Sequence, residues 1–356
     1  MQNRIIEIDA LKAAAVTAVI IIHSISAAIA PFLTKWPQIG LLLGTDQIMR
    51  FSVPFFITVS GYLLAGKYQH TKIEFVPFLK KRALQLLPMY FLWSGIIYLY
   101  LNYFTGEPGN QYNLLQITFL GRADYHLYFV PVLFYLYLTF PILIYLNRKS
   151  KTAVLITALT LQLAAILFAN LVNNHFFQPP FLWGDQQQYV FPLSWIFYFV
   201  LGIYLQGING TNLQKIVRAI SVISIVPAAI YLFVDSLTIY KETQSYISAT
   251  TFTRLSILIF ASLTAIIFLS WQQTVLRIPK LAVRLLSSIG KRSYNIYLFH
   301  TLVIRILYQL VKPENLLSTA VFILGTVFIT FTTSAVFYGL FAKVRPLFLK
   351  RRSLLP

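Results

Sequence analysis

The chain has 356 residues, of which 58% are hydrophobic and 11% are charged, and its mean hydropathy is +0.70. This composition excludes a soluble globular protein and indicates a chain that crosses a lipid bilayer many times. The net charge of +19 does not indicate a nucleic-acid partner, because the basic residues lie in short segments between long apolar runs. Cysteine is absent, which excludes disulfides and thiol chemistry.

The first apolar segment carries a basic residue at its head and a histidine deep inside it. Eleven residues separate Lys12 from His23, so at about 100° per residue both side chains fall within about 20° of one helix face. The rise between them is about 16 Å, which puts the imidazole roughly halfway through the hydrocarbon. Asp9 precedes Lys12 by three residues and is spaced to pair with it. His23 is therefore a functional candidate, with a hydrogen bond to a neighbouring helix as the structural alternative.

Apolar segments of membrane-spanning length follow one another along the whole chain. We expect ten transmembrane helices, at 13–33, 41–66, 84–104, 126–146, 153–172, 190–208, 216–235, 250–270, 286–311 and 316–341. The expected fold class is all-α, a polytopic membrane protein. With no internal repeat or linker in the sequence, we expect one transmembrane domain over residues 1–356 and no appended soluble domain.

Lysine and arginine predict the orientation of these helices. They concentrate in one set of alternate segments, whereas the other set holds only Lys35, Arg122, Lys241 and Lys312. Because basic residues are retained on the cytoplasmic side, both termini are expected to be cytoplasmic. The even number of expected spans agrees with this orientation.

Polar residues of the outer half suggest a second substrate side. Asp46 and Arg50 are spaced four residues apart, so Arg50 either forms a satisfied ion pair or faces a cavity and holds an acceptor. His126 opens the fourth span, either as an interfacial hydrogen-bonding residue or as part of a site mouth. The outer loop 170–188 is rich in amide and aromatic side chains, which suit a sugar but also serve as interface anchors.

The ninth expected span repeats the pattern of the first, with a basic inner end and an intramembrane histidine. Lys291 and Arg292 stand at its head, and His300 lies about 12 Å beyond Arg292 if the segment is helical. Arg254 and Arg305 also fall within or near spans, where they face the bundle or extend toward the interface. The sequence has no metal-ligand spacing and no phosphate-binding glycine loop, so we expect no metal.

Five motifs together resemble the acyltransferase-3 family of integral membrane acyltransferases. The motifs are Asp9-Ala10-Leu11-Lys12…His23; Val53-Pro54-Phe55-Phe56…Ser60-Gly61-Tyr62-Leu63-Leu64 preceded by Arg50; Lys81-Arg82…Leu87-Pro88…Tyr90; His126-Leu127-Tyr128-Phe129; and Ser293-Tyr294…Ile296-Tyr297-Leu298-Phe299-His300. The family usually has arginine where this chain has Lys12. Lysine binds phosphate as a point charge, whereas arginine can form a bidentate hydrogen-bonded pair with it. Binding of the acyl donor is therefore expected to differ in detail from that of the family.

The resemblance implies transfer of an acetyl or succinyl group from cytoplasmic acyl-CoA to a sugar hydroxyl of a cell-surface glycan or its lipid-linked precursor. The expected location is the cell membrane, and polysaccharide O-acetylation is one such activity. The sequence leaves a homo-oligomer open. A glycan-lipid transporter or flippase is the alternative function, although the inverted repeats and paired broken helices common in transporters are not visible in the sequence.

The resemblance and the helix geometry together assign expected roles. The catalytic residues would be His23 and His300. The acyl-CoA donor would contact Lys12 with its partner Asp9, and also Arg82, Lys291 and Arg292. The acceptor would contact Arg50, His126 and Tyr297. His23 would act either as a general base or through an acyl-histidine intermediate.

Overall fold

The computed structural model describes residues 6–105, 114–173 and 187–352, and every element in these ranges is a helix. The expected all-α class is therefore confirmed. Most of the outer loop 170–188 lies outside the described residues.

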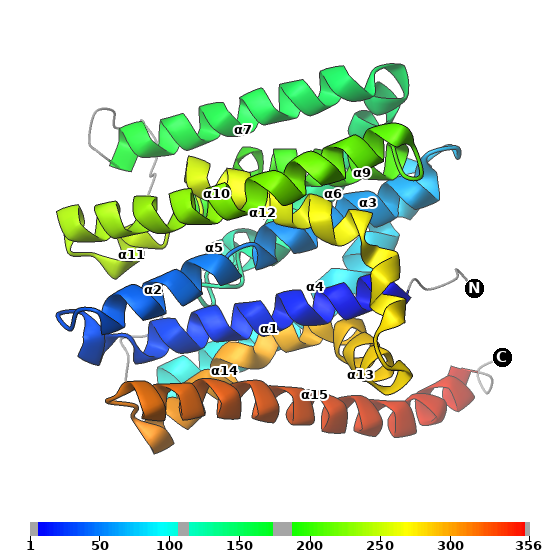
Figure 1. Cartoon of the computed structure of the whole chain (residues 1–356). Coiled ribbons are helices and arrows are strands. Elements are labelled where there is room, and N and C mark those ends of the chain that lie inside the picture. The colour runs from blue at the N-terminus through cyan, green and yellow to red at the C-terminus, as the bar shows by residue number, and fades with distance from the viewer. Residues whose placement is uncertain (1–5, 106–113, 174–186, 353–356) are drawn as a thin grey trace.

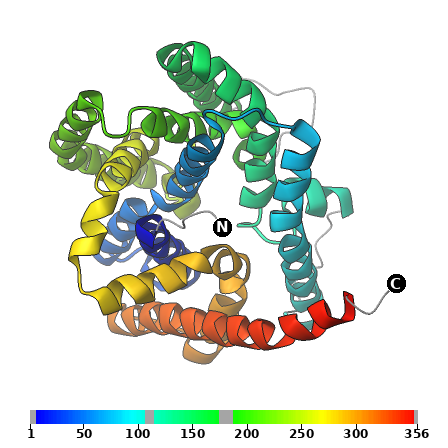
Figure 2. The same cartoon turned by 90° about the vertical axis from the view of Figure 1, so that its right-hand side faces the viewer.

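The helices occupy most of the expected spans. Their bounds are α1 Ile6–Ala28, η1 Ala30–Phe32, α2 Gln38–Met49, α3 Ser52–Tyr68, α4 Phe75–Phe104, α5 Leu114–Leu120, α6 Phe129–Lys149, α7 Lys151–Asn173, α8 Gln187–Val190, η2 Pro192–Ser194, α9 Ile196–Gly207, α10 Asn212–Thr243, α11 Tyr246–Ala249, α12 Leu255–Ser270, η3 Gln272–Arg277, α13 Lys280–Lys291, α14 Ser293–Val311 and α15 Leu316–Arg352. Long α7 and α15 lie at opposite edges of the bundle with α1 between them, and both ends of the chain lie at the same end of the molecule (Figures 1 and 2).

Seven candidate membrane spans are long and apolar enough within the described ranges: α1, the pair α2 and α3, α4, α6, α7, α10 and α15. The expected spans at 190–208 and 250–270 correspond to the shorter apolar helices α9 and α12. The chain is thus a multi-pass membrane protein, while the count of ten and the cytoplasmic termini stay predictions. Peripheral α10 exposes side chains such as Ile223 and Val226, as a lipid-facing helix does.

Two expected spans have different bounds in the structure. The expected span 41–66 lies within the candidate span Gln38–Tyr68. Its helix is interrupted at Arg50 and Phe51, because Pro54 lacks an amide hydrogen and its ring would clash with the carbonyl of Arg50 in a continuous helix. The expected span 286–311 begins too early. Residues before Arg292 belong to α13, a separate helix whose buried Val283, Ser287 and Gly290 recur with helical spacing and pack on α1.

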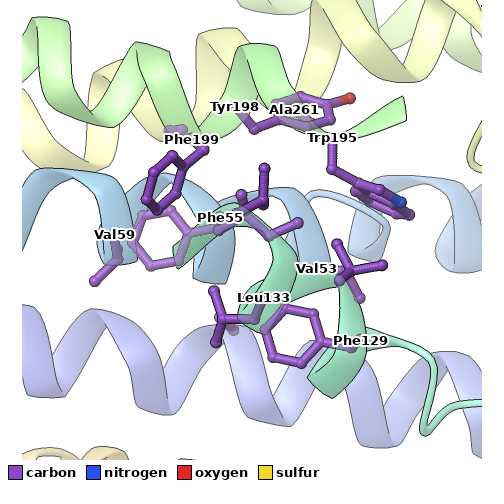
Figure 3. Close-up of a cluster of buried hydrophobic side chains, with 14 of the residues drawn as sticks. Val53, Phe55, Val59, Phe129, Leu133, Trp195, Tyr198, Phe199 and Ala261 are labelled. Atoms are coloured by element: carbon purple, nitrogen blue, oxygen red, sulfur yellow. The ribbon is translucent and has the colours of Figure 1, made fainter. Parts of the chain in front are cut away.

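Glycines allow the closest helix contacts. A Cβ atom on Gly61 would lie 2.1 Å from the carbonyl oxygen of Phe199, and one on Gly202 would lie 1.9 Å from that of Thr58. Only glycine therefore permits the observed crossing of α3 and α9. Buried side chains from α3, α6 and the α9 region fill the core around this crossing (Figure 3).

A third close approach joins α1 to α13. A Cβ atom on Gly290 would lie 1.6 Å from the carbonyl oxygen of Asp9. The contact brings the basic end of α13, Lys291 and Arg292, beside the part of α1 that carries Lys12. Residues far apart in the sequence thereby meet at one end of the bundle.

Candidate active site

Three histidines from different parts of the chain meet inside the bundle. His23 comes from α1, His126 from the segment before α6, and His300 from α14. The ring centroid of His23 lies 5.1 Å from that of His300 and 6.2 Å from that of His126, and the latter two are 4.9 Å apart. We name these residues the histidine cluster. Sequence reasoning had placed His23 and His300 at similar depths, and the structure makes them neighbours.

His23 lies in the last third of α1. Five residues separate it from the end of α1 at Ala28, whereas the helix begins at Ile6. His23 is thus about 7 Å from one end of α1 and about 25 Å from the other. Its expected depth, about halfway through the hydrocarbon, stays a prediction.

His23 is the least buried member of the cluster. His126 is 1% exposed and His300 is fully buried, while His23 retains a partly accessible surface. The ring of Tyr125 packs edge-on against His23 with a centroid distance of 5.0 Å. No hydrogen bond holds the His23 ring within the described part of the chain, so its nitrogens remain available for proton transfer or attack.

The hydrogen bonds of His300 orient its ring. Its Nδ1 lies 2.7 Å from the carbonyl oxygen of Tyr297, and a carbonyl can only accept, so Nδ1 donates. In the neutral ring Nε2 then carries the lone pair, and this buried atom has no hydrogen-bond partner among the described residues. His300 is therefore set to accept a proton or a hydrogen bond from a group entering the cluster.

Tyr297 supports the cluster. Its hydroxyl donates to the carbonyl oxygen of His126, and its ring centroid lies 5.5 Å from that of His126. The side chain is 3% exposed, so it fixes the backbone at His126 from the side of α14. Its expected contact with the acceptor stays a prediction.

Asp124 is a site residue that sequence reasoning missed. Its Oδ2 accepts a hydrogen bond from Thr301 at 2.9 Å, and its Oδ1 lies 3.0 Å from Nη2 of Arg305. Nδ1 of His126 lies 3.4 Å from Oδ2, an ion-pair distance without hydrogen-bond geometry. Burial alone would raise the pKa of Asp124, but the neighbouring His126, Arg305 and Thr301 hold this pKa well below its usual range. The only sequence signal was an acidic residue two positions before His126.

The basic end of the bundle contains the expected donor residues. Lys12 and Asp9 form the expected ion pair, with 3.2 Å between Nζ and Oδ1. The carboxylate is buried, whereas the side chain of Lys12 is 22% exposed. Lys291 is exposed. Nε of Arg292, the residue between α13 and α14, donates to the carbonyl oxygen of Ser288 in α13. The close approach of α13 to α1 brings these cations to one region.

Arg82 of α4 faces the interior from the same end. Its Nη1 donates to Gln85 at 2.9 Å, and its guanidinium lies 5.8 Å from the ring centroid of Tyr137. The hydroxyl of Tyr137 lies 2.8 Å from that of Ser60, which makes a polar pair in the middle of the bundle. α4 also contacts α14, where the hydroxyl of Tyr294 donates to Leu86 at 2.7 Å. The structure gives no contact that joins Arg82 to Lys12, Lys291 or Arg292 in the described residues.

Arg50 forms the ion pair that its spacing from Asp46 allows. Nε of Arg50 lies 2.5 Å from Oδ1 of Asp46, and Oδ2 of the same carboxylate accepts a hydrogen bond from the hydroxyl of Tyr246 at 2.9 Å. The guanidinium stacks 4.7 Å above the ring centroid of Phe252. Its expected contact with an acceptor stays a prediction.

Arg254 belongs to the same outer network. Its Nη1 donates to Asp235 at 2.9 Å and to Ser236 at 3.1 Å, and its Nη2 donates to Gln47. Gln47 in turn donates to Asp46 at 3.1 Å. The network ties α2 to α10 and to the start of α12. No group of three or more His, Cys, Asp or Glu in the described ranges is arranged to hold a metal.

An all-helical bundle with several candidate spans and a histidine cluster between its helices defines an integral membrane protein with an intramembrane site. The chain belongs to the acyltransferase-3 family, whose sequence pattern, described as an acyltransferase domain, matches residues 5–339. It is also similar to an amino-acid racemase from Enterococcus faecalis, with 29% identity over 139 residues that make up 37% of this chain and 18% of the racemase. This chain therefore spans only a small part of that relative. None of the solved structures matches the chain.

Proposed function

We propose that this protein transfers an acyl group from cytoplasmic acyl-CoA to a sugar hydroxyl of a cell-surface glycan or its lipid-linked precursor, from within the cell membrane. Acetyl-CoA and succinyl-CoA are the donors to test first. The observation that carries the proposal is an accessible His23 held against two buried histidines in a chain of an acyltransferase family.

The donor would bind from the end that carries Lys12, Arg82, Lys291 and Arg292. Four cations at one end of the bundle suit the phosphates of coenzyme A, and Asp9 would hold Lys12 in place. The pantetheine arm would extend past the polar pair of Ser60 and Tyr137 toward His23. An extended arm suits this route because about 16 Å of helix separates Lys12 from His23.

The acceptor would enter from the opposite end. Arg50, stacked on Phe252, would hydrogen-bond acceptor oxygens with the part of its guanidinium that Asp46 leaves free. His126 and Tyr297 would line the acceptor side of the cluster. Aromatic faces and charge-assisted hydrogen bonds together suit a sugar ring with hydroxyls.

His23 would act as the general base. Its lone-pair nitrogen takes the proton of the acceptor hydroxyl while the oxygen attacks the thioester carbonyl carbon. The carbon–sulfur bond then breaks, and the leaving thiolate takes the proton from His23 to give free coenzyme A and the acyl ester. In the alternative route His23 itself receives the acyl group and the hydroxyl attacks this acyl-histidine. His300, with its unpartnered Nε2, would share the proton in either route.

Release of coenzyme A by the purified protein in detergent tests the proposal. Because the chain contains no cysteine, every thiol that reacts with a chromogenic disulfide comes from the donor. We expect thiol release from acetyl-CoA or succinyl-CoA that rises when a membrane glycolipid fraction is added. If folded protein neither binds nor cleaves any acyl-CoA, the proposal fails, and transport of labelled glycolipid between the leaflets of a vesicle becomes the measurement to make.

A further inference from the structure

The segment from Asp124 to His126 is fastened to α14 on both sides of His300. On the N-terminal side of His300, the hydroxyl of Tyr297 donates to the carbonyl oxygen of His126. On its C-terminal side, Thr301 and Arg305 both donate to the carboxylate of Asp124, at 2.9 Å and 3.0 Å. These contacts extend over two turns of α14, so the segment and the helix form one wall of the site.

Asp124 also binds the backbone of Tyr125, the other residue of this segment whose ring lies against His23. The backbone amide of Tyr125 donates to Oδ1 of Asp124 at 2.8 Å, and the guanidinium of Arg305 lies 6.0 Å from the Tyr125 ring centroid. The Tyr125 ring in turn packs on His23. The carboxylate thus bonds directly to the backbone of Tyr125 and lies 3.4 Å from Nδ1 of His126, whose Nε2 lies 3.3 Å from the carbonyl oxygen of Leu298.

We propose that Asp124 is a positioning residue for the acyl transfer: it holds His126 and Tyr125 in place against His23 and does not itself contact substrate. This inference rests on the proposed function. Asp124 is 6% exposed, and its two oxygens accept hydrogen bonds from Thr301, Arg305 and the Tyr125 amide. A buried carboxylate with such partners keeps one geometry, because releasing any of them leaves a buried polar group unsatisfied.

The Asp124→Asn variant keeps the size of the side chain and removes its charge. We expect kcat for acyl transfer to fall by about 100-fold, the scale on which a displacement of about 1 Å acts on a reacting geometry. The dissociation constant for acetyl-CoA should not change, because the proposed phosphate site is at the other end of α1. Arg305→Gln removes the same ion pair by changing the cation, whose side chain is 26% exposed. It should also lower kcat.

A double-variant comparison separates positioning from general stability. If Asp124 acts largely through His126, adding Asp124→Asn to His126→Ala should lower kcat much less than it does in the wild type. Arg148→Gln is the matched control, because Arg148 donates to the carbonyl oxygens of Tyr68, Gln69 and Thr71 far from the cluster. It should lower the melting temperature and leave kcat per folded molecule unchanged. Full additivity of Asp124→Asn and His126→Ala, or an unchanged kcat in Asp124→Asn, would overturn the inference.

A readout without turnover keeps this test independent of the proposed function. Diethylpyrocarbonate modifies accessible imidazoles, and mass spectrometry measures the rate at His23. Freeing Tyr125 and His126 should raise this rate several-fold in Asp124→Asn, while Arg148→Gln should match the wild type. Equal rates in the wild type and Asp124→Asn would contradict the positioning role. If the wild type cleaves no acyl-CoA, the proposed function fails. The modification rates of His23 still decide whether Asp124 holds Tyr125 and His126 in place.

Discussion

The imidazole of His300 lies 5.1 Å from that of His23, centroid to centroid, although the two residues stand near opposite ends of the chain. His300 donates through Nδ1 to the carbonyl oxygen of Tyr297 and keeps Nε2 without a partner in the described residues. His23 has an accessible surface and His300 has none. The pair thus joins a partly exposed imidazole to a buried one whose ring is fixed by a hydrogen bond, an arrangement suited to proton transfer.

Replacing His23 with alanine tests its proposed role as the base. We expect kcat to fall by about 10² to 10⁴, the usual contribution of a positioned general base, with acetyl-CoA binding retained. Thiol release in detergent measures the rate, and calorimetry measures the binding. His70→Ala is the matched control because His70 is exposed in the turn after α3. A His23→Ala protein that is folded and fully active would refute the assignment.

Replacing Lys12 separates donor binding from chemistry. Lys12→Ala should weaken acetyl-CoA binding by about tenfold, which corresponds to about 1.4 kcal/mol, because one charge-assisted contact to phosphate is lost. Lys12→Arg should bind at least as tightly as the wild type, since a guanidinium can grip phosphate with two hydrogen bonds. Calorimetry gives both values. Lys35→Ala, in the segment after η1 and beyond the opposite end of α1, serves as the control. Equal affinities for Lys12→Ala and Lys35→Ala would place the phosphates elsewhere.

Arg50 offers a test of its two interpretations. Arg50→Met leaves the buried Asp46 without its cation and should cost about 3–5 kcal/mol of stability. Adding Asp46→Asn removes the unpaired charge and should recover most of that loss. We expect the double variant to melt near the wild-type temperature and still fail to transfer an acyl group to acceptor. Recovery of transfer together with stability would show that Arg50 is structural only.

The crossing of α3 and α9 predicts a sharp size limit at Gly202. Gly202→Ala would place a methyl group 1.9 Å from a backbone carbonyl oxygen, so the helices must separate. Overpacking of this kind costs about 1–3 kcal/mol or more. Gly325→Ala in α15 is the control, because nothing lies within 4 Å of its added Cβ. Thermal denaturation in detergent should show a clear loss for the first and no loss for the second; equal melting temperatures would mean that the crossing is looser than described.

Several features of the site followed from local sequence patterns. The residues of the ion pairs Asp9–Lys12 and Asp46–Arg50 are helical neighbours, so spacing predicts the first and offers the second as one of two alternatives. The single span expected at 41–66 lies within the candidate span formed by α2 and α3. Pro54, whose amide hydrogen is missing, interrupts the helix of that span between α2 and α3.

The sequence by itself determined the class of the protein and the helices that carry its polar residues. Apolar runs of membrane length and the 3.6-residue period act within one segment, so they need no knowledge of the neighbours. Only the tertiary structure decided which helices touch. The approach of α1 to α13 depends on Gly290 meeting Asp9, and the site depends on Asp124 tying a loop to α14 beside His23. Such contacts join residues that are distant in the sequence through packing and buried hydrogen bonds. They produce no periodic pattern in the sequence from which they could be predicted.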